Sequence, residues 1–414
     1  MSFSKLFIRF AFKTWLLITF LFGSLLYLYG DLDDPDPGGA LYFLFKDLFG
    51  ILVGGLIIFV ASQKKIPKIT FSWAVFYLIL FLYVASFILI GGDELGLNYY
   101  RVFKNNILYI GFSIIVLSCF LKLESEYYLI KVVLDSLFIA LIISLLLFWF
   151  SPVQSYTGRL FGTFGSPNSA GFVSGFAIAL ALTSKNFIGK WRSMELLVIF
   201  ISFLVMFFTA SIGTILGILL FLYLVLIGRN LSFYRILIST IIFSLFISIV
   251  FFTFYMIFIQ NATQVEIEII SRLISIAIQG EINDSIAIRF RDFLLSLTMS
   301  CQDYRALPVL LGCIPADDFV RFDSVIFSII YNFGYIFGAI FLLLIFYPAT
   351  YILLNRNSTR WSSKYKKIYP LIFFLISFVP INLILQHSFD LYPTNYLYAI
   401  LLAILYNRRS KKYS

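Results

Sequence analysis

Arginine side chains are the most distinctive chemical groups in this sequence. Seven of them lie in the polar segments that the topology derived below places outside the membrane, and a single lysine, Lys104, accompanies them there. These arginines are Arg101, Arg159, Arg272, Arg289, Arg291, Arg305 and Arg321. A guanidinium is a planar fork that donates two parallel hydrogen bonds to a phosphate, whereas lysine offers only a point charge. The group indicates a phosphate or pyrophosphate site; the alternative is simple pairing with acids, as Arg289 can pair with Asp292.

The segment after Arg159 predicts a turn and the start of a helix. Ser166 is a good N-cap residue, and Pro167 suits the first helical position. Because a helix N-terminus attracts anions, Arg159 and Asn168 are candidate ligands for one anionic group.

Composition shows which elements must hold these residues. Of the 414 residues, 61% are apolar and only 13% are charged, and there are 50 Phe and 26 Tyr. A soluble chain has too little interior for so much apolar surface, so lipid must be part of the solvent. This excludes soluble enzymes, nucleic-acid-binding domains and disordered scaffolds. The net charge of +10 then reflects basic cytoplasmic segments and not a nucleic-acid partner.

The apolar runs predict an all-α polytopic membrane protein with about twelve transmembrane helices in a single membrane domain, 1–414. A helix needs roughly 20 apolar residues to cross a bilayer. The expected spans are 13–30, 41–62, 71–91, 106–121, 131–150, 169–183, 194–210, 212–228, 236–259, 325–347, 369–386 and 393–407. A short turn at Ser211 predicts that 194–210 and 212–228 form a tight hairpin.

Lysine and arginine set the expected orientation. With both termini in the cytoplasm, most of the 31 basic residues fall on the inner side, as the positive-inside rule requires. The segments that carry the basic residues on the inner side are 5–13, 64–68, 122–131, 185–192, 229–235, 356–367 and 408–412. The acidic cluster at 31–36 falls outside.

Two extracytoplasmic loops carry the polar chemistry. The shorter, 151–170, contains Arg159. The longer, 260–324, has helical spacing of apolar and polar residues in two places, which predicts two amphipathic helices at the outer membrane surface, with Arg272 and Arg289 on their polar faces. Cys301 and Cys313 fall in this loop, where a disulfide is allowed, and no His/Cys cluster suggests a metal.

Several motifs resemble those of bacterial O-antigen polymerases and O-antigen ligases over roughly 155–345. Arg159-Leu-Phe-Gly-Thr-Phe-Gly-Ser-Pro-Asn168 resembles the family's R-x-x-G-x-x-x-x-P-N signature. Phe208-Thr-Ala-Ser-Ile-Gly-Thr resembles its T-x-S-R turn, with Ile212 in place of Arg. Arg272 and Arg289 match its two Arg-bearing loop helices, Leu307-Pro-x-Leu-x-Gly312 its P-L-x-G-x-G turn, and Asp323-Ser followed by Gly334 and Gly338 its H-N…G-x-x-G segment.

The resemblance implies a C-type glycosyltransferase of the bacterial inner membrane, with an undecaprenyl-pyrophosphate-linked oligosaccharide as donor and no metal or other cofactor. Membrane lipid and a chain-length regulator protein are the further partners it implies. Because a pyrophosphate leaving group gathers negative charge in the transition state, Arg159, Arg272 and Arg289 are expected to stabilise it. Asp323, which stands where many members of the family have His, is the expected base or acceptor-orienting group. Asn168, Arg291, Arg305 and Arg321 are the expected substrate-binding residues.

Three functions stay open at this point. Ligases usually keep a His after the long loop, where this chain has Asp323, so a polymerase is favoured over a ligase that transfers glycan to lipid A-core. A flippase or transporter for lipid-linked oligosaccharides is the alternative of another class. It would place charges near the membrane midplane, which this sequence largely lacks.

Overall fold

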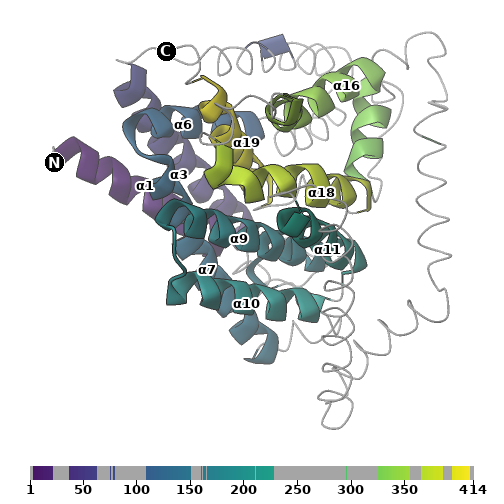
Figure 1. The fold of residues 1–414 in the computed structure, drawn as a ribbon. Coiled ribbons are helices and arrows are strands. Elements are labelled where there is room, and N and C mark those ends of the chain that lie inside the picture. The colour runs from purple at the N-terminus through teal and green to yellow at the C-terminus, as the bar shows by residue number, and fades with distance from the viewer. Residues whose placement is uncertain are drawn as a thin grey trace, which may run out of the picture.

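The structure is a computed structural model that describes residues 3–21, 37–62, 75, 78, 79, 109–150, 160, 162–164, 166–209, 211–227, 295, 324–354, 365–385 and 394–410. These residues form helices joined by turns, with no strand among them (Figure 1). The all-α prediction is therefore confirmed for this part of the chain.

The helices match the predicted spans, apart from 71–91 and 236–259, which lie almost entirely outside the described residues. They are α1 (Phe3–Leu21), α3 (Pro37–Ser62), α6 (Tyr109–Leu123), α7 (Glu126–Phe150), α9 (Pro167–Ile188), α10 (Ser193–Thr209), α11 (Ile212–Ile227), α16 (Val325–Leu354), α18 (Tyr369–Leu385) and α19 (Thr394–Ser410). Two short 3-10 turns, η3 (Gly162–Phe164) and η5 (Lys366–Ile368), precede α9 and α18.

Length and apolar composition identify three described helices that could cross a membrane: Glu126–Phe150, Pro167–Ile188 and Lys366–Leu383. Shorter apolar helices lie beside them. Large apolar side chains are also exposed on the outer faces of the bundle, among them Leu52, Phe59, Phe150 and Phe200. Lipid is the solvent that such surfaces favour, which indicates membrane association.

Helix α9 lies at the centre, packed between α10 and α18 and against α7 (Figure 1). Small side chains make this possible: a Cβ atom at Gly175 would lie 2.8 Å from the ring of Phe378, and one at Gly217 of α11 would lie 2.9 Å from the same ring. Phe172 stacks on Tyr398 of α19, with 4.6 Å between ring centroids. The central helices are therefore held by close contact around aromatic rings.

The turn at Ser211 is present, but the predicted hairpin is wrong. Helix α10 packs along α9, whereas α11 packs along α18, and α10 and α11 do not pack along each other. Close contact of Gly217 of α11 with the Phe378 ring favours packing of α11 on α18, whereas α10 packs on the small-residue surface of α9. The two helices therefore diverge from their shared turn.

Helix α1 begins at Phe3, ten residues before the predicted span. Lys5 and Arg9, expected in a loop, lie on the helix because both reach Glu124 at the end of α6. Arg9 donates to both carboxylate oxygens, at 2.7 and 2.6 Å, and Lys5 Nζ lies 3.7 Å from Glu124 Oε1. Arg9 also lies over the Tyr128 ring. These contacts continue the helix beyond its apolar part.

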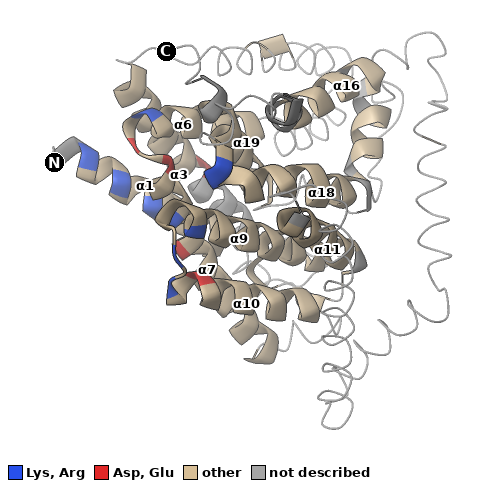
Figure 2. Ribbon diagram, viewed as in Figure 1, with Lys and Arg blue, Asp and Glu red and all other residues tan. Residues whose placement is uncertain are grey.

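Most charged residues of the described helices lie towards one end of the bundle, which we call the charged end (Figure 2). Asn407 of α19 donates to Glu126 at 3.2 Å, and Lys367 lies over the ring of Phe187 at the end of α9. The structure therefore brings together segments that the sequence assigns to one side of the membrane. This is the arrangement that the predicted alternation of spans requires.

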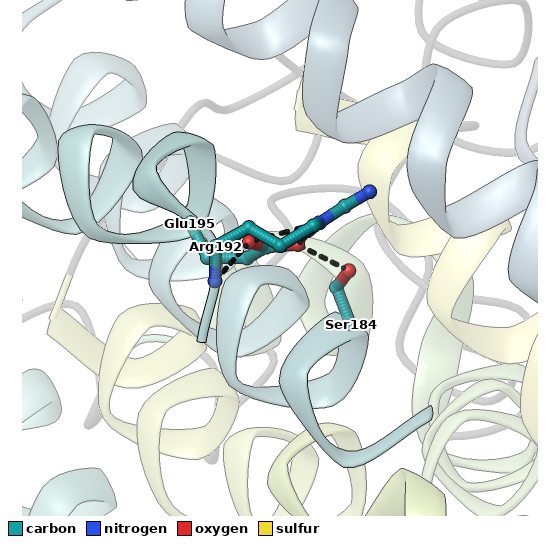
Figure 3. A network of polar contacts seen from close by, with 3 residues as sticks. All are labelled: Ser184, Arg192 and Glu195. Carbon is teal, nitrogen blue, oxygen red and sulfur yellow. Dashed lines mark hydrogen bonds and ion pairs between the residues drawn. The ribbon is translucent and has the colours of Figure 1, made fainter. Parts of the chain in front are cut away.

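A buried carboxylate joins α9 to α10 at the charged end (Figure 3). Glu195 is fully buried and accepts hydrogen bonds from Ser184 Oγ at 2.9 Å and from Arg192 Nε at 2.9 Å. The side-chain bond to Glu195 raises the pKa of the Arg192 guanidinium above its ordinary value. The ion pair fixes the short turn between the helices and neutralises Glu195.

Helix α16 is broken at Gly334, whose φ of 81° and ψ of 169° are not helical. Figure 1 shows its two parts running in different directions. The left-handed φ is accessible to glycine at little cost, so this residue permits the sharp bend.

Cysteine labelling in intact cells tests the orientation. In a chain whose three native cysteines are replaced, Asn283→Cys should react with an impermeant reagent, whereas exposed Lys190→Cys at the charged end should react only after permeabilisation. Labelling of Lys190→Cys in intact cells, with Asn283→Cys protected, would reverse the topology.

Candidate functional site

The end of the bundle opposite the charged end holds the motif segment that begins at Arg159. Leu160, the residue after Arg159, is fully buried, and its backbone N–H donates to the carbonyl oxygen of Phe208 at 2.9 Å. Phe208 lies in the last turn of α10, in the second motif of the resemblance. The two motifs, distant in sequence, therefore meet here.

The turn η3 is fixed to the side of α7 by Ser144. The Thr163 backbone N–H donates to Ser144 Oγ at 3.1 Å, and the two hydroxyls lie 3.0 Å apart. Ser144 also donates to the Ala140 carbonyl at 2.7 Å. Gly162 has a φ of 49°, and a Cβ atom there would lie 2.3 Å from Ser144 Cβ. Only glycine fits both this backbone and this contact.

Gly162→Ala should therefore destabilise the fold and abolish function. The left-handed backbone and the forced contact with Ser144 together cost about 2–5 kcal/mol. Melting of the purified protein in detergent measures the effect. Gly55→Ala is the matched control, because a Cβ there meets nothing within 4 Å and alanine favours the helix. Equal stability of the two variants would contradict the proposed fixing of η3.

Helix α9 begins as the sequence predicts. Ser166 has extended backbone angles, and its side chain accepts from the Ser169 N–H at 3.0 Å, which is an N-cap. Pro167 occupies the first turn. The N-terminus of the central helix therefore opens at the end of the bundle where the two motifs meet.

Asn168 links this helix start to the turn between α10 and α11. Ser211 Oγ donates to Asn168 Oδ1 at 3.2 Å, and Thr214 Oγ1 donates to Ser211 Oγ at 3.1 Å. A Cβ at Gly171 would lie 2.4 Å from Thr214 Oγ1, so the helices touch at this point. Asn168 is half-buried, and its amide nitrogen has no partner among the described residues, so it can donate to a bound oxygen.

Aromatic side chains border this end of the bundle. The ring of Phe208 lies 5.1 Å from that of Phe148 and 5.6 Å from that of Trp149, measured between centroids. Trp149 and Phe150 are exposed at the end of α7. Such rings suit contact with a sugar face or with a lipid chain.

The start of α16 is held at the end of α18. Ser324, which follows Asp323, is fully buried and donates to the Leu383 carbonyl at 3.1 Å. Leu383 lies far along α18 from Lys367, so Ser324 lies away from the charged end. This contact fixes the chain beside Asp323.

Asn168 is the one predicted site residue that the structure describes. Arg159, Arg272, Arg289, Arg291, Arg305, Arg321 and Asp323 lie outside the described residues, as do Cys301 and Cys313 and nearly all of the loop 260–324. Cys119 is buried in the core, where it packs as a small apolar side chain. Within the described ranges no three His, Cys, Asp or Glu side chains gather as a metal site would require.

Sequence reasoning missed Ser144, Thr163 and Thr214 as supports of the site. Serine and threonine in an apolar helix commonly bond to their own backbone, so their spacing carries no signal for a partner in another helix. Gly162 itself was the available clue, since a glycine in a turn often marks a left-handed backbone or a close approach to another element.

No protein-family profile matches the sequence, and no curated protein matches it. The resemblance to O-antigen polymerases and ligases therefore rests on the motifs themselves and on how the chain arranges them.

Proposed function

We propose that this chain is a membrane glycosyltransferase that polymerises undecaprenyl-pyrophosphate-linked oligosaccharide repeat units into a surface polysaccharide. The reaction takes place at the outer face of the bacterial cytoplasmic membrane, with both termini in the cytoplasm. The site is the end of the bundle opposite the charged end, together with the arginines of the long loop.

The observation that supports this proposal most is the meeting of the two motifs. The Leu160–Phe208 hydrogen bond and the Ser211–Asn168 hydrogen bond hold the segments 159–168 and 208–214 at one place. Helix packing alone does not require these two hydrogen bonds, because buried apolar helices can be held together without polar contacts at their ends. A polar junction with one amide donor left over suits the binding of an oxygen-rich ligand.

The chemistry follows from charge. The acceptor hydroxyl oxygen attacks the anomeric carbon of the donor sugar, the bond from that carbon to the pyrophosphate oxygen breaks, and configuration inverts. The electron pair leaves with undecaprenyl pyrophosphate. The negative charge that grows on the pyrophosphate is stabilised by the preorganised guanidinium groups of Arg159, Arg272 and Arg289. The Asn168 amide donates a hydrogen bond to an oxygen of the substrate. Asp323 takes the proton of the acceptor hydroxyl. Arg291, Arg305 and Arg321 hold the substrate.

The envelope glycan of a deletion strain, separated on a gel, tests the function. A polymerase deletion should leave core glycan carrying one repeat unit. Loss of all capped core with accumulated lipid-linked polymer would identify a ligase instead. Single lipid-linked units retained on the inner leaflet would identify a transporter. Either of the last two results would overturn the proposal.

Asp323→Asn should abolish polymer formation while the protein still binds lipid-linked donor. An amide cannot accept the acceptor proton, and a positioned base contributes roughly 10²–10⁴-fold to rate. Asparagine caps a helix nearly as well as aspartate, so the start of α16 should survive. Normal polymer at normal protein level would show that Asp323 is a cap and not the base.

A further inference from the structure

A second feature of the molecule lies at the charged end, far from the proposed active site. The end of α9 and the turn η5 pack together and carry basic and aromatic side chains. We call this set the basic surface; its members are Lys185, Phe187, Lys190, Trp191, Lys366 and Lys367.

Its lysines are arranged around aromatic rings. Lys367 Nζ lies 5.2 Å from the centroid of the Phe187 ring, and Lys185 Nζ lies 5.4 Å from that of Trp191. Lys190, Lys366 and Lys367 are exposed, and Trp191 is 42% exposed. Two lysine–aromatic pairs, from α9 and from η5, therefore lie at the same end of α9.

No acid neutralises this charge within the described chain. Glu195, the nearest carboxylate in sequence to Trp191, is buried and bound to Arg192 and Ser184. Lysines 366 and 367 have no salt bridge among the described residues, and the sequence contains no Asp or Glu from 325 to 389. The basic surface thus keeps a positive charge that is available to an external anion.

An exposed apolar stripe continues from the basic surface along α10. Leu196, Leu197 and Phe200 follow Trp191 by about one to two turns, and their side chains are 52%, 48% and 62% exposed. Lipid covers an apolar face of this kind, so the basic surface at the end of the same helices meets the headgroup region. Tryptophan and lysine at this depth are typical of the headgroup region of a bilayer.

We propose that the basic surface is a binding site for the headgroup of an anionic phospholipid. The phosphate contacts the lysines of η5 and of the end of α9. Binding there joins α9 to α18 and stabilises the charged end. This site is independent of the proposed glycosyltransferase activity.

Thermal melting of the purified protein in zwitterionic detergent tests the site. Added phosphatidylglycerol should raise the melting temperature, whereas phosphatidylcholine should not. Lys366→Gln/Lys367→Gln should weaken the apparent phosphatidylglycerol affinity roughly 10- to 30-fold, since each surface lysine contributes to anionic lipid binding. Lys366→Gln alone, which keeps the Lys367–Phe187 contact, should show a smaller loss.

The matched control is Lys13→Gln/Lys131→Gln, which removes two other exposed lysines near the charged end and changes net charge equally. This variant should keep wild-type affinity. An equal loss in both double variants would show a response to net charge alone and overturn the site. Failure of phosphatidylglycerol to stabilise the wild type would also overturn it, as would equal stabilisation by inorganic pyrophosphate.

Discussion

Arg289→Lys and Arg289→Ala should both abolish polymer formation, with the protein inserted at normal levels. Arg289 lies on the polar face of a predicted amphipathic helix, where its guanidinium can reach a pyrophosphate at the membrane surface. Charge-assisted hydrogen bonds are worth roughly 1.5–3 kcal/mol each, so losing one or two in the transition state slows transfer roughly ten- to several-thousand-fold. Lysine keeps the charge but loses the paired geometry.

Asp292→Ala separates this role from a surface ion pair. A surface pair between Arg289 and Asp292 contributes only about 0–1 kcal/mol and tolerates lysine. If pairing were the purpose of Arg289, Asp292→Ala and Arg289→Ala would behave alike. We expect the Asp292 variant to stay active in the glycan-profile assay. Wild-type polymer from Arg289→Ala would remove this arginine from the site.

Arg159→Lys and Arg159→Ala should each lower the rate of glycan transfer about as much as the Arg289 variants do. The next residue in the chain, Leu160, is buried and bonded to Phe208, which fixes the motif segment at the end of α10. A fork positioned in this way stabilises developing charge without reorganisation. Rates of transfer from lipid-linked donor measure the effect, roughly ten- to several-thousand-fold by the same hydrogen-bond values.

Lys104→Ala is the control for Arg159. Lys104 lies in another segment assigned to the outer side, outside the motifs of the resemblance and outside the group of arginines, so its loss should leave polymer formation intact. Melting of Arg159→Ala should match wild type, because Leu160 carries the contact to α10. A variant that is active, or one that is inactive only because it is unfolded, would contradict the assigned role.

The sequence predicted most helix positions because apolar runs of this length have few other stable forms in lipid. The two shortest predicted spans, 169–183 and 393–407, correspond to α9 and α19, which have 22 and 17 residues and lie deep inside the bundle. Hydropathy is low there because α9 uses small residues for close packing and α19 carries Tyr and Asn. Helices that face protein instead of lipid lose the signal that predicts spans.

The sequence could not predict which helices pack against each other. The hairpin at Ser211 failed because a short turn fixes only where two helices begin, whereas side-chain fit along α9 and α18 decides where they go. At the site, the N-cap at Ser166 was predictable from local rules, since capping involves residues next to each other. The bonds from Ser144 to Thr163 and from Ser211 to Asn168 join different helices, which no local spacing encodes.

Reconstitution tests the central proposal most directly. The purified protein in liposomes, given undecaprenyl-pyrophosphate-linked repeat units and a metal chelator but no nucleotide sugar, should produce a ladder of longer lipid-linked glycans. It should release undecaprenyl pyrophosphate in step with each added unit, and Arg159→Ala should produce neither. Two results would contradict the proposed polymerase. In the first, single units remain unchanged after incubation with the folded wild-type protein. In the second, single units move across the bilayer without being joined.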